Sequence, residues 1–312
     1  MKRLHSHGAV ALLLMGFSAA IVADDICGDS TGQAQIAARE ADVARVEKSG
    51  DKVQIFLAYQ GAVGAECASD GVVAKARASL PKLGRELAAK AEADGVLYTK
   101  APPRADGKTS AFAWLEASGN FAEADRVMLK AVHAKPEDME LFKSAWHVDD
   151  LSGRRSGRDY KASASYRQEL EKLAKTSAAK LMSLEEQDAK GLTADAGTLG
   201  TSASKSLEKL QRAADWMQFL PEGDKPAKVR AEQRGDTIMK RGDAGLMGGV
   251  ALGYYQFAGS PKAAQVEAKM EATGRAIEKS SEKVKDAIVE KNADDQTKFK
   301  KGQADLEKEL DF

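Results

Sequence analysis

The chain has 312 residues, and its 47 basic and 47 acidic side chains give a formal net charge of zero at pH 7. This balance excludes the basic footprint expected of a protein that binds nucleic acid or an acidic membrane surface. Aromatic residues make up only 6% of the chain, while alanine is abundant. This composition favours an all-α protein with a thin core of small side chains over a sheet.

The N-terminus has the pattern of a secretory signal peptide. Lys2 and Arg3 precede a largely apolar run from Ala9 to Val22, and Ala23 offers a small residue for cleavage. We therefore expect residues 1–23 to be a signal peptide and the protein to be exported, either periplasmic or secreted. An uncleaved anchor is the alternative, but the run is shorter than the roughly 20 residues that cross a bilayer. We expect no transmembrane segment after signal removal.

Two cysteines, Cys27 and Cys67, remain in the mature chain. In an exported protein they most simply form one disulfide. Two free thiols or a metal pair are the alternatives. A third or fourth ligand is not close in sequence, so we expect no metal site.

Residues 24–149 are expected to form an N-terminal helical-repeat domain. Helices are predicted at Gln33 to Lys48 and Val53 to Ala68, around a turn at Gly50-Asp51. A third helix ends near Ala93, and Pro102-Pro103 marks a non-helical linker.

The passage from Ala111 to Pro136 predicts a helix, a tight turn at Gly119-Asn120 and a second helix. It resembles a tetratricopeptide repeat, whose pattern combines a turn, alanines spaced around a large residue, and a closing proline. The matching residues are Gly119, Asn120, Phe121, Glu123, Ala124, Met128, Ala131 and Pro136.

The resemblance implies stacked hairpins that line a groove for a protein or peptide partner. On this repeat the groove positions would be Thr109, Ala113 and Glu116. Weaker echoes of the pattern follow Gly50-Asp51 and Gly242-Asp243. Any amphipathic hairpin with an alanine-rich seam would give the same pattern, so this alternative stays open.

Residues 150–200 are expected to be a basic loop, a long helix and a linker. The loop carries Arg154, Arg155 and Arg158, which suit a carboxylate or phosphate on a partner. A solvated loop is the alternative. Tyr160 to Lys190 predicts a long helix, either a spine that joins two halves or a coiled-coil arm.

Residues 201–312 are expected to form a C-terminal helical-repeat region. Ala244 to Ala258 carries Gly245, Gly249 and Gly253 and predicts a buried helix with a closely packed neighbour. Val266 to Phe312 predicts a charged tail helix that projects or frays. Its sparse apolar positions are Val284, Ile288, Leu306 and Leu310.

Signs of catalysis are few. His133 and His147 are the only imidazoles outside the signal. His147 with Asp149 and Asp150 is a candidate for metal binding or base catalysis, and a surface histidine beside an acidic pair is the alternative. The chain has no H-E-x-x-H or P-loop motif. We expect no enzyme activity, no catalytic residues and no cofactor.

The sequence as a whole predicts an all-α protein of helical hairpin repeats, arranged as a tetratricopeptide-like solenoid with a long connecting helix and a C-terminal helical array. The predicted function is a non-enzymatic scaffold in the cell envelope that binds a protein or peptide partner. A structural or surface component that assembles into oligomers through coiled-coil helices is the alternative. An enzyme of unknown class comes third.

Overall fold

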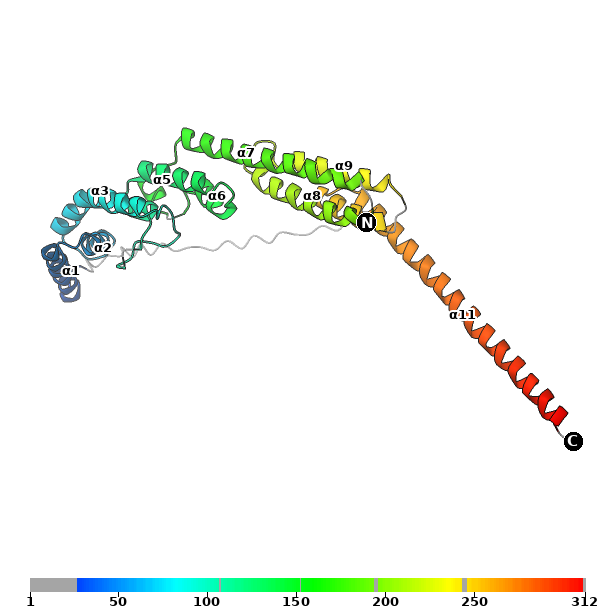
Figure 1. The fold of residues 1–312 in the computed structure, drawn as a ribbon. Helices are drawn as coiled ribbons and strands as arrows, with labels where there is room; N and C mark the ends of the chain where they lie inside the picture. The colour runs from blue at the N-terminus through cyan, green and yellow to red at the C-terminus, as the bar shows by residue number, and fades with distance from the viewer. Residues whose placement is uncertain (1–26, 107, 152, 194–195, 243–245, 311–312) are drawn as a thin grey trace, which may run out of the picture. The chain divides into compact units, whose positions relative to one another are not determined.

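A computed structural model describes residues 27–106, 108–151, 153–193, 196–242 and 246–310. In these ranges the chain forms eleven α-helices and two short 3-10 helices, with no strand (Figure 1). The all-α prediction is confirmed. The predicted signal peptide, residues 1–23, lies outside the described ranges.

The chain divides into two compact units, and the boundary falls between Val127 and Met128. It lies inside helix α5 (Phe121–Ala134). The predicted boundaries at 149/150 and 200/201 differ from this division, because the long helix predicted between them packs along its C-terminal neighbour rather than standing as a separate segment.

The first unit is built from α1 (Ser30–Ser49), α2 (Lys52–Val63), α3 (Asp70–Ala93), α4 (Ala111–Ser118) and the start of α5. Polar side chains cap the first turns, as when Asp51 accepts hydrogen bonds from two backbone amides of α2. Gly50 and Gly119 have φ values of 70° and 80°, a left-handed conformation that glycine adopts without strain. The two predicted turns are therefore confirmed.

The core of the first unit brings aromatic rings from different helices together. Phe56 of α2 meets Trp114 of α4 edge to face, with ring centroids 4.9 Å apart. Gly84 allows α3 to approach α4 closely, because a Cβ at that position would lie 2.4 Å from Cβ of Ser118. Ala124, predicted for the apolar side of α5, is fully buried.

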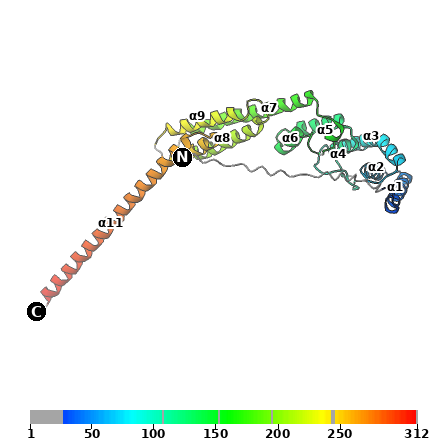
Figure 2. The same cartoon turned by 180° about the vertical axis from the view of Figure 1, so that it is seen from behind.

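The second unit contains α6 to α11 and both 3-10 helices. Their bounds are α6 Met139–Trp146, η1 Ser156–Arg158, α7 Ala164–Ala189, η2 Lys190–Thr193, α8 Ala196–Met217, α9 Lys225–Met239, α10 Leu246–Ala258 and α11 Lys262–Leu310. Helices α7, α8 and α9 run side by side in both views (Figures 1 and 2). The predicted long helix at Tyr160 to Lys190 corresponds to α7.

The core formed by α7 to α10 combines apolar side chains with the buried carboxylate of Glu185. Leu210, Ile238 and Tyr254 come from α8, α9 and α10 and are fully buried. Gly253 of α10 confirms the predicted close packing, because a Cβ there would lie 3.2 Å from a methyl carbon of Leu207 on α8. Residues 243–245, with Gly245 and part of the predicted turn at Gly242-Asp243, lie outside the described ranges.

Candidate functional site

Helix α11 begins in the bundle and then continues with no other described part of the chain covering it. Val266 is buried and Met270 is partly buried, whereas residues 271–308 are all exposed. At about 1.5 Å per residue this exposed stretch is roughly 57 Å long. Both views show α11 continuing past the bundle (Figures 1 and 2).

Large apolar side chains recur along one side of this helix. Val266, Ile277, Ile288 and Phe299 follow one another at intervals of eleven residues. Eleven residues make about three helical turns, so these side chains share one face. We define the α11 stripe as Val266, Met270, Ile277, Val284, Ile288, Phe299 and Leu306. Ile288 is 54% exposed and Phe299 73% exposed.

The beginning of the stripe is already an interface. Gly248 of α10 faces it so closely that a Cβ there would lie 3.1 Å from Cγ of Met270 and 3.4 Å from Cγ1 of Val266. The same face of α11 is therefore covered by α10 at its start and uncovered from Ile277 onward. Exposed apolar side chains that share one face of a helix make the α11 stripe the candidate interaction surface of this unit.

Ionic contacts fix the first turn of α11 on α9. The Lys262 ammonium lies 2.8 and 2.9 Å from the two carboxylate oxygens of Asp236 and 3.0 Å from Glu232. Tyr255 of α10 donates to the same Asp236 at 2.8 Å. These contacts hold the direction in which α11 leaves the bundle.

Their electrostatics follow from the geometry. Burial alone would raise the pKa of Asp236, but the hydrogen bonds from Lys262 and Tyr255 outweigh it, and the pKa is lowered. The hydrogen bonds to Asp236 and Glu232 raise the pKa of Lys262. Burial, together with its hydrogen bond to Asp236, raises the pKa of Tyr255 to about 12.

A second feature of the unit is an open groove of about 580 Å³ between α7 and the α8–α9 turn. Its lining combines the apolar side chains of Ala178, Met217 and Leu220 with the charged side chains of Lys172 and Lys175. Gln168, Glu171 and Glu222 also line it. The α11 stripe is the more developed surface.

The predicted groove residues do not lie on an open surface. Thr109, Ala113 and Glu116 are buried, at 2%, 6% and 4% exposure. Thr109 instead accepts a hydrogen bond from the Arg104 backbone at 3.0 Å. Their burial does not fit a contact with a partner, and the proposal below uses other residues.

The basic loop is partly structural. Arg155 is fully buried, 3.4 Å from the Asp149 carboxylate, and its guanidinium carbon lies 5.3 Å from the Tyr160 ring centroid. The assignment of Arg155 to a partner contact is therefore corrected, because it holds the loop in place. Arg154 and Arg158 are exposed, as predicted for a loop at the surface.

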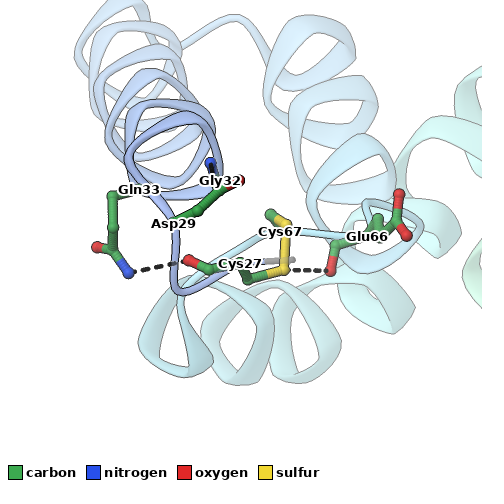
Figure 3. The surroundings of a disulfide bond; sticks show 6 residues. All are labelled: Cys27, Asp29, Gly32, Gln33, Glu66 and Cys67. Carbon is green, nitrogen blue, oxygen red and sulfur yellow. Dashed lines mark hydrogen bonds between the residues drawn. A yellow bond between two sulfur atoms is a disulfide. The ribbon is translucent and has the colours of Figure 1, made fainter. Parts of the chain in front are cut away.

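The predicted disulfide is confirmed. Cys27 and Cys67 join with an S–S distance of 2.09 Å and a Cα separation of 5.3 Å (Figure 3). Gln33 donates to the Cys27 carbonyl at 3.0 Å beside it. The Cys27 sulfur also lies 3.3 Å from the Glu66 carbonyl oxygen. An oxidised sulfur has no hydrogen to donate, so we treat this approach as a packing contact.

The histidine candidate is not assembled into a site. His147 is exposed, while its neighbour Asp149 accepts hydrogen bonds from Arg167 at 2.7 Å and from the Ala162 amide at 2.9 Å. Within the described ranges, histidine, cysteine, aspartate and glutamate side chains form no group of three or more that would hold a metal ion.

Sequence reasoning found part of the α11 stripe. It named Val284, Ile288 and Leu306 but missed Ile277 and Phe299. Ile277, Ile288 and Phe299 are spaced eleven residues apart, and this spacing is the sequence signal that places them on one face. Spacings of three, four and seven residues do not detect it.

Among the described helices, none combines the length and the apolar character needed to cross a bilayer. Comparison of the chain with protein-family models, with curated proteins and with solved structures finds no match.

Proposed function

We propose that this protein is an exported helical scaffold that joins a helix of a protein partner along the α11 stripe. One observation carries the proposal: the face of α11 that α10 covers at Val266 and Met270 continues, uncovered, through Ile277 to Leu306. A helix gains most of its stability in proteins from packing of its apolar face. A second helix on this face would supply the contact that α10 supplies at its start.

The shape of the stripe favours a helix over a lipid surface as its occupant. The stripe residues lie along a narrow seam, as in a coiled coil, but at about two per eleven residues they are sparser than the two per seven of a heptad seam. A helix that lies in a membrane interface has a broader apolar face and a basic polar face. The polar faces of α11 carry acidic and basic side chains interspersed along their length.

The energetics are sufficient for association with a matched partner. Burial of a Val, Leu, Ile or Phe side chain contributes about 1.5–3 kcal/mol. The five stripe side chains from Ile277 to Leu306 are 54–73% exposed, so together they would contribute at most about 7–15 kcal/mol from this chain alone. This is comparable with the estimated cost of association, about 4–15 kcal/mol. A partner with an apolar seam of its own would supply the surplus.

Export is part of the proposal. The Cys27–Cys67 disulfide supports it, because structural disulfides persist in oxidising compartments such as the periplasm or the extracellular space. The apolar run at residues 9–22 remains a predicted signal peptide.

A repeat arrangement of hairpins in the second unit is also proposed. In stacked hairpins each helix contacts its sequence neighbours and the equivalent helix of the next hairpin. Neighbouring helices α7 to α11 pack in series, and Arg234 of α9 reaches Glu185 of α7. These contacts support serial stacking.

Site-specific photo-crosslinking in the native host tests the proposed function. A photoreactive amino acid placed at Ile288 or Phe299 lies on the stripe, whereas one at Glu290 is about 200° around the helix from Ile288. We expect a crosslinked protein adduct from the first two positions and none from Glu290. The proposal fails if the stripe positions give no more adduct than Glu290.

A further inference from the structure

The charges along the exposed part of α11 are balanced. Residues 271–308 contain nine acidic and nine basic side chains. The acidic ones are Glu271, Glu278, Glu282, Asp286, Glu290, Asp294, Asp295, Asp305 and Glu307, and the basic ones are Arg275, Lys279, Lys283, Lys285, Lys291, Lys298, Lys300, Lys301 and Lys308. This part of α11 therefore has no net positive charge that would attract an anionic lipid surface or a nucleic acid. A second helix of the same composition meets no net repulsion.

One ionic residue interrupts the stripe itself. Asp295 lies eleven residues after Val284 and eleven before Leu306, at the position that these apolar residues hold in the neighbouring repeats. Two copies of α11 placed side by side in parallel register would bring their Asp295 carboxylates together in an apolar seam. Like charges in such a place are strongly disfavoured.

The opposite orientation removes this conflict. Consider two copies of α11 that pair antiparallel, with the midpoint of the pair between residues 293 and 294. Asp295 of one copy then lies opposite Asn292 of the other, and Lys291 follows Asn292 by one residue. The amide and the ammonium are both donors to the carboxylate. In the same register Ile288 lies opposite Phe299, because two residues at equal distances on either side of the midpoint face each other when one copy is reversed.

This register also covers the exposed stripe from Ile277 to Leu306, with Ile288 opposite Phe299, Val284 opposite Gln303 and Leu306 opposite Ser281. Two antiparallel arms centred at residues 293 and 294 overlap from Ile277 onward, and each bundle stays at its own end of the pair. The contact with α10 ends at Met270, and the overlap with the second copy begins at Ile277. Both interfaces therefore fit on one helix.

We infer that the occupant of the α11 stripe is a second copy of this chain, docked antiparallel with Ile288 opposite Phe299 and Asp295 opposite Asn292. This inference rests on the proposed function and names its partner. The product is a dimer in which the two bundles are held at opposite ends of a two-helix rod.

Thiol crosslinking of the mature full chain tests the register. Val284→Cys and Gln303→Cys lie opposite each other in the antiparallel pair, and each is far from its own copy. The Val284→Cys chain and the Gln303→Cys chain are mixed, and one of the two carries a tag that changes its size. The mixture is treated with a short bismaleimide, which leaves the native disulfide oxidised. We expect the mixed dimer to exceed both same-residue dimers by on the order of tenfold.

The matched control pair is Glu290→Cys with Thr297→Cys. These positions lie at an equivalent height in the same register but face away from the seam, so we expect no crosslink above background. All four substitutions are at exposed positions of α11, and circular dichroism checks that each chain is helical.

Each other outcome overturns the inference. Same-residue dimers of Val284→Cys show a parallel pair. A lack of crosslinks, together with a stripe photo-adduct to a different protein, shows that another chain is the occupant while the proposed function stands. If the photo-adduct is also missing, the proposed function fails as well.

Discussion

Glu185 on α7 and Arg234 on α9 form a two-pronged ion pair inside the second unit. The Arg234 guanidinium donates to the two carboxylate oxygens at 2.8 and 3.1 Å, and the Glu185 side chain is fully buried. Ser206 of α8 donates to the same carboxylate at 2.7 Å. Three helices thus meet at one carboxylate. The hydrogen bonds to Glu185 and its charge raise the pKa of Arg234, against the effect of burial.

Replacing Glu185 by Gln is expected to destabilise the second unit by about 3–5 kcal/mol, because it leaves the Arg234 charge without its partner in a mostly dry place. The neighbouring Glu186→Gln is the control, because Glu186 is exposed. Its effect should stay within about 0.5 kcal/mol. Urea denaturation followed by circular dichroism measures both. Equal effects of the two substitutions would show that the ion pair does not hold the bundle.

Gly84 is expected to tolerate no side chain. A Cβ there would lie 2.4 Å from Cβ of Ser118 and 3.1 Å from the Trp114 carbonyl oxygen. Gly84→Ala should therefore cost about 1–3 kcal/mol through overpacking of α3 on α4. Gly71, at the start of the same helix, has nothing within 4 Å. Gly71→Ala should be neutral or stabilising by up to about 1 kcal/mol. Thermal unfolding that ranks the two variants in the reverse order contradicts the packing.

Reduction of the disulfide is expected to loosen the first unit alone. The bond closes a loop with a sequence separation of 40 residues. Its chain-entropy contribution is about 4 kcal/mol. After reduction, hydrogen exchange should accelerate in α1 and α2 and stay unchanged in α7 to α10, which serve as the internal control. Unchanged exchange in α1 and α2 would show that the bond adds no stability.

Acid is expected to weaken the loop between α6 and α7. Burial alone would raise the pKa of Asp149, but hydrogen bonds from the Ala162 amide and Arg167 outweigh it, so the pKa lies below the ordinary value of 3.8. A depressed pKa contributes stability above pH 3.8 that is lost as pH falls through the folded-state value.

The measurement is the unfolding free energy as a function of pH. The wild type should lose stability more steeply than Asp149→Asn below about pH 4. Asp159→Asn is the control, because Asp159 is exposed on the same loop. Identical slopes for the wild type and Asp149→Asn would rule out this linkage.

The helices and the disulfide were predictable because their signals are local. Gly50 and Gly119 mark turns through backbone conformations that other residues adopt at a cost, and two cysteines allow only one pairing. The helix ends differ from the predictions by a few residues, as when α2 ends at Val63 instead of Ala68, because capping depends on neighbouring contacts.

The roles of side chains were less predictable. Arg155 sits in a glycine-rich basic segment that is typical of a solvated loop, and only the position of Asp149 and Tyr160 in space shows why it is buried. Thr109 and Glu116 were placed by analogy with a repeat, and burial depends on how neighbouring helices pack. Part of the α11 stripe could be predicted from the sequence, because eleven residues are close to three full turns of an α-helix.

The central claim is that the α11 stripe is covered by a helix in the working protein, and the solvent accessibility of the stripe in the native host tests this most directly. Single cysteines at Ile288, Phe299 and Glu290 are labelled with a water-soluble maleimide in intact envelope fractions and in the dilute purified chain. The account predicts labelling in the envelope that is on the order of tenfold slower at Ile288 and Phe299 than at Glu290, with the three rates equal in the dilute chain. Equal rates at all three positions in the envelope would contradict it.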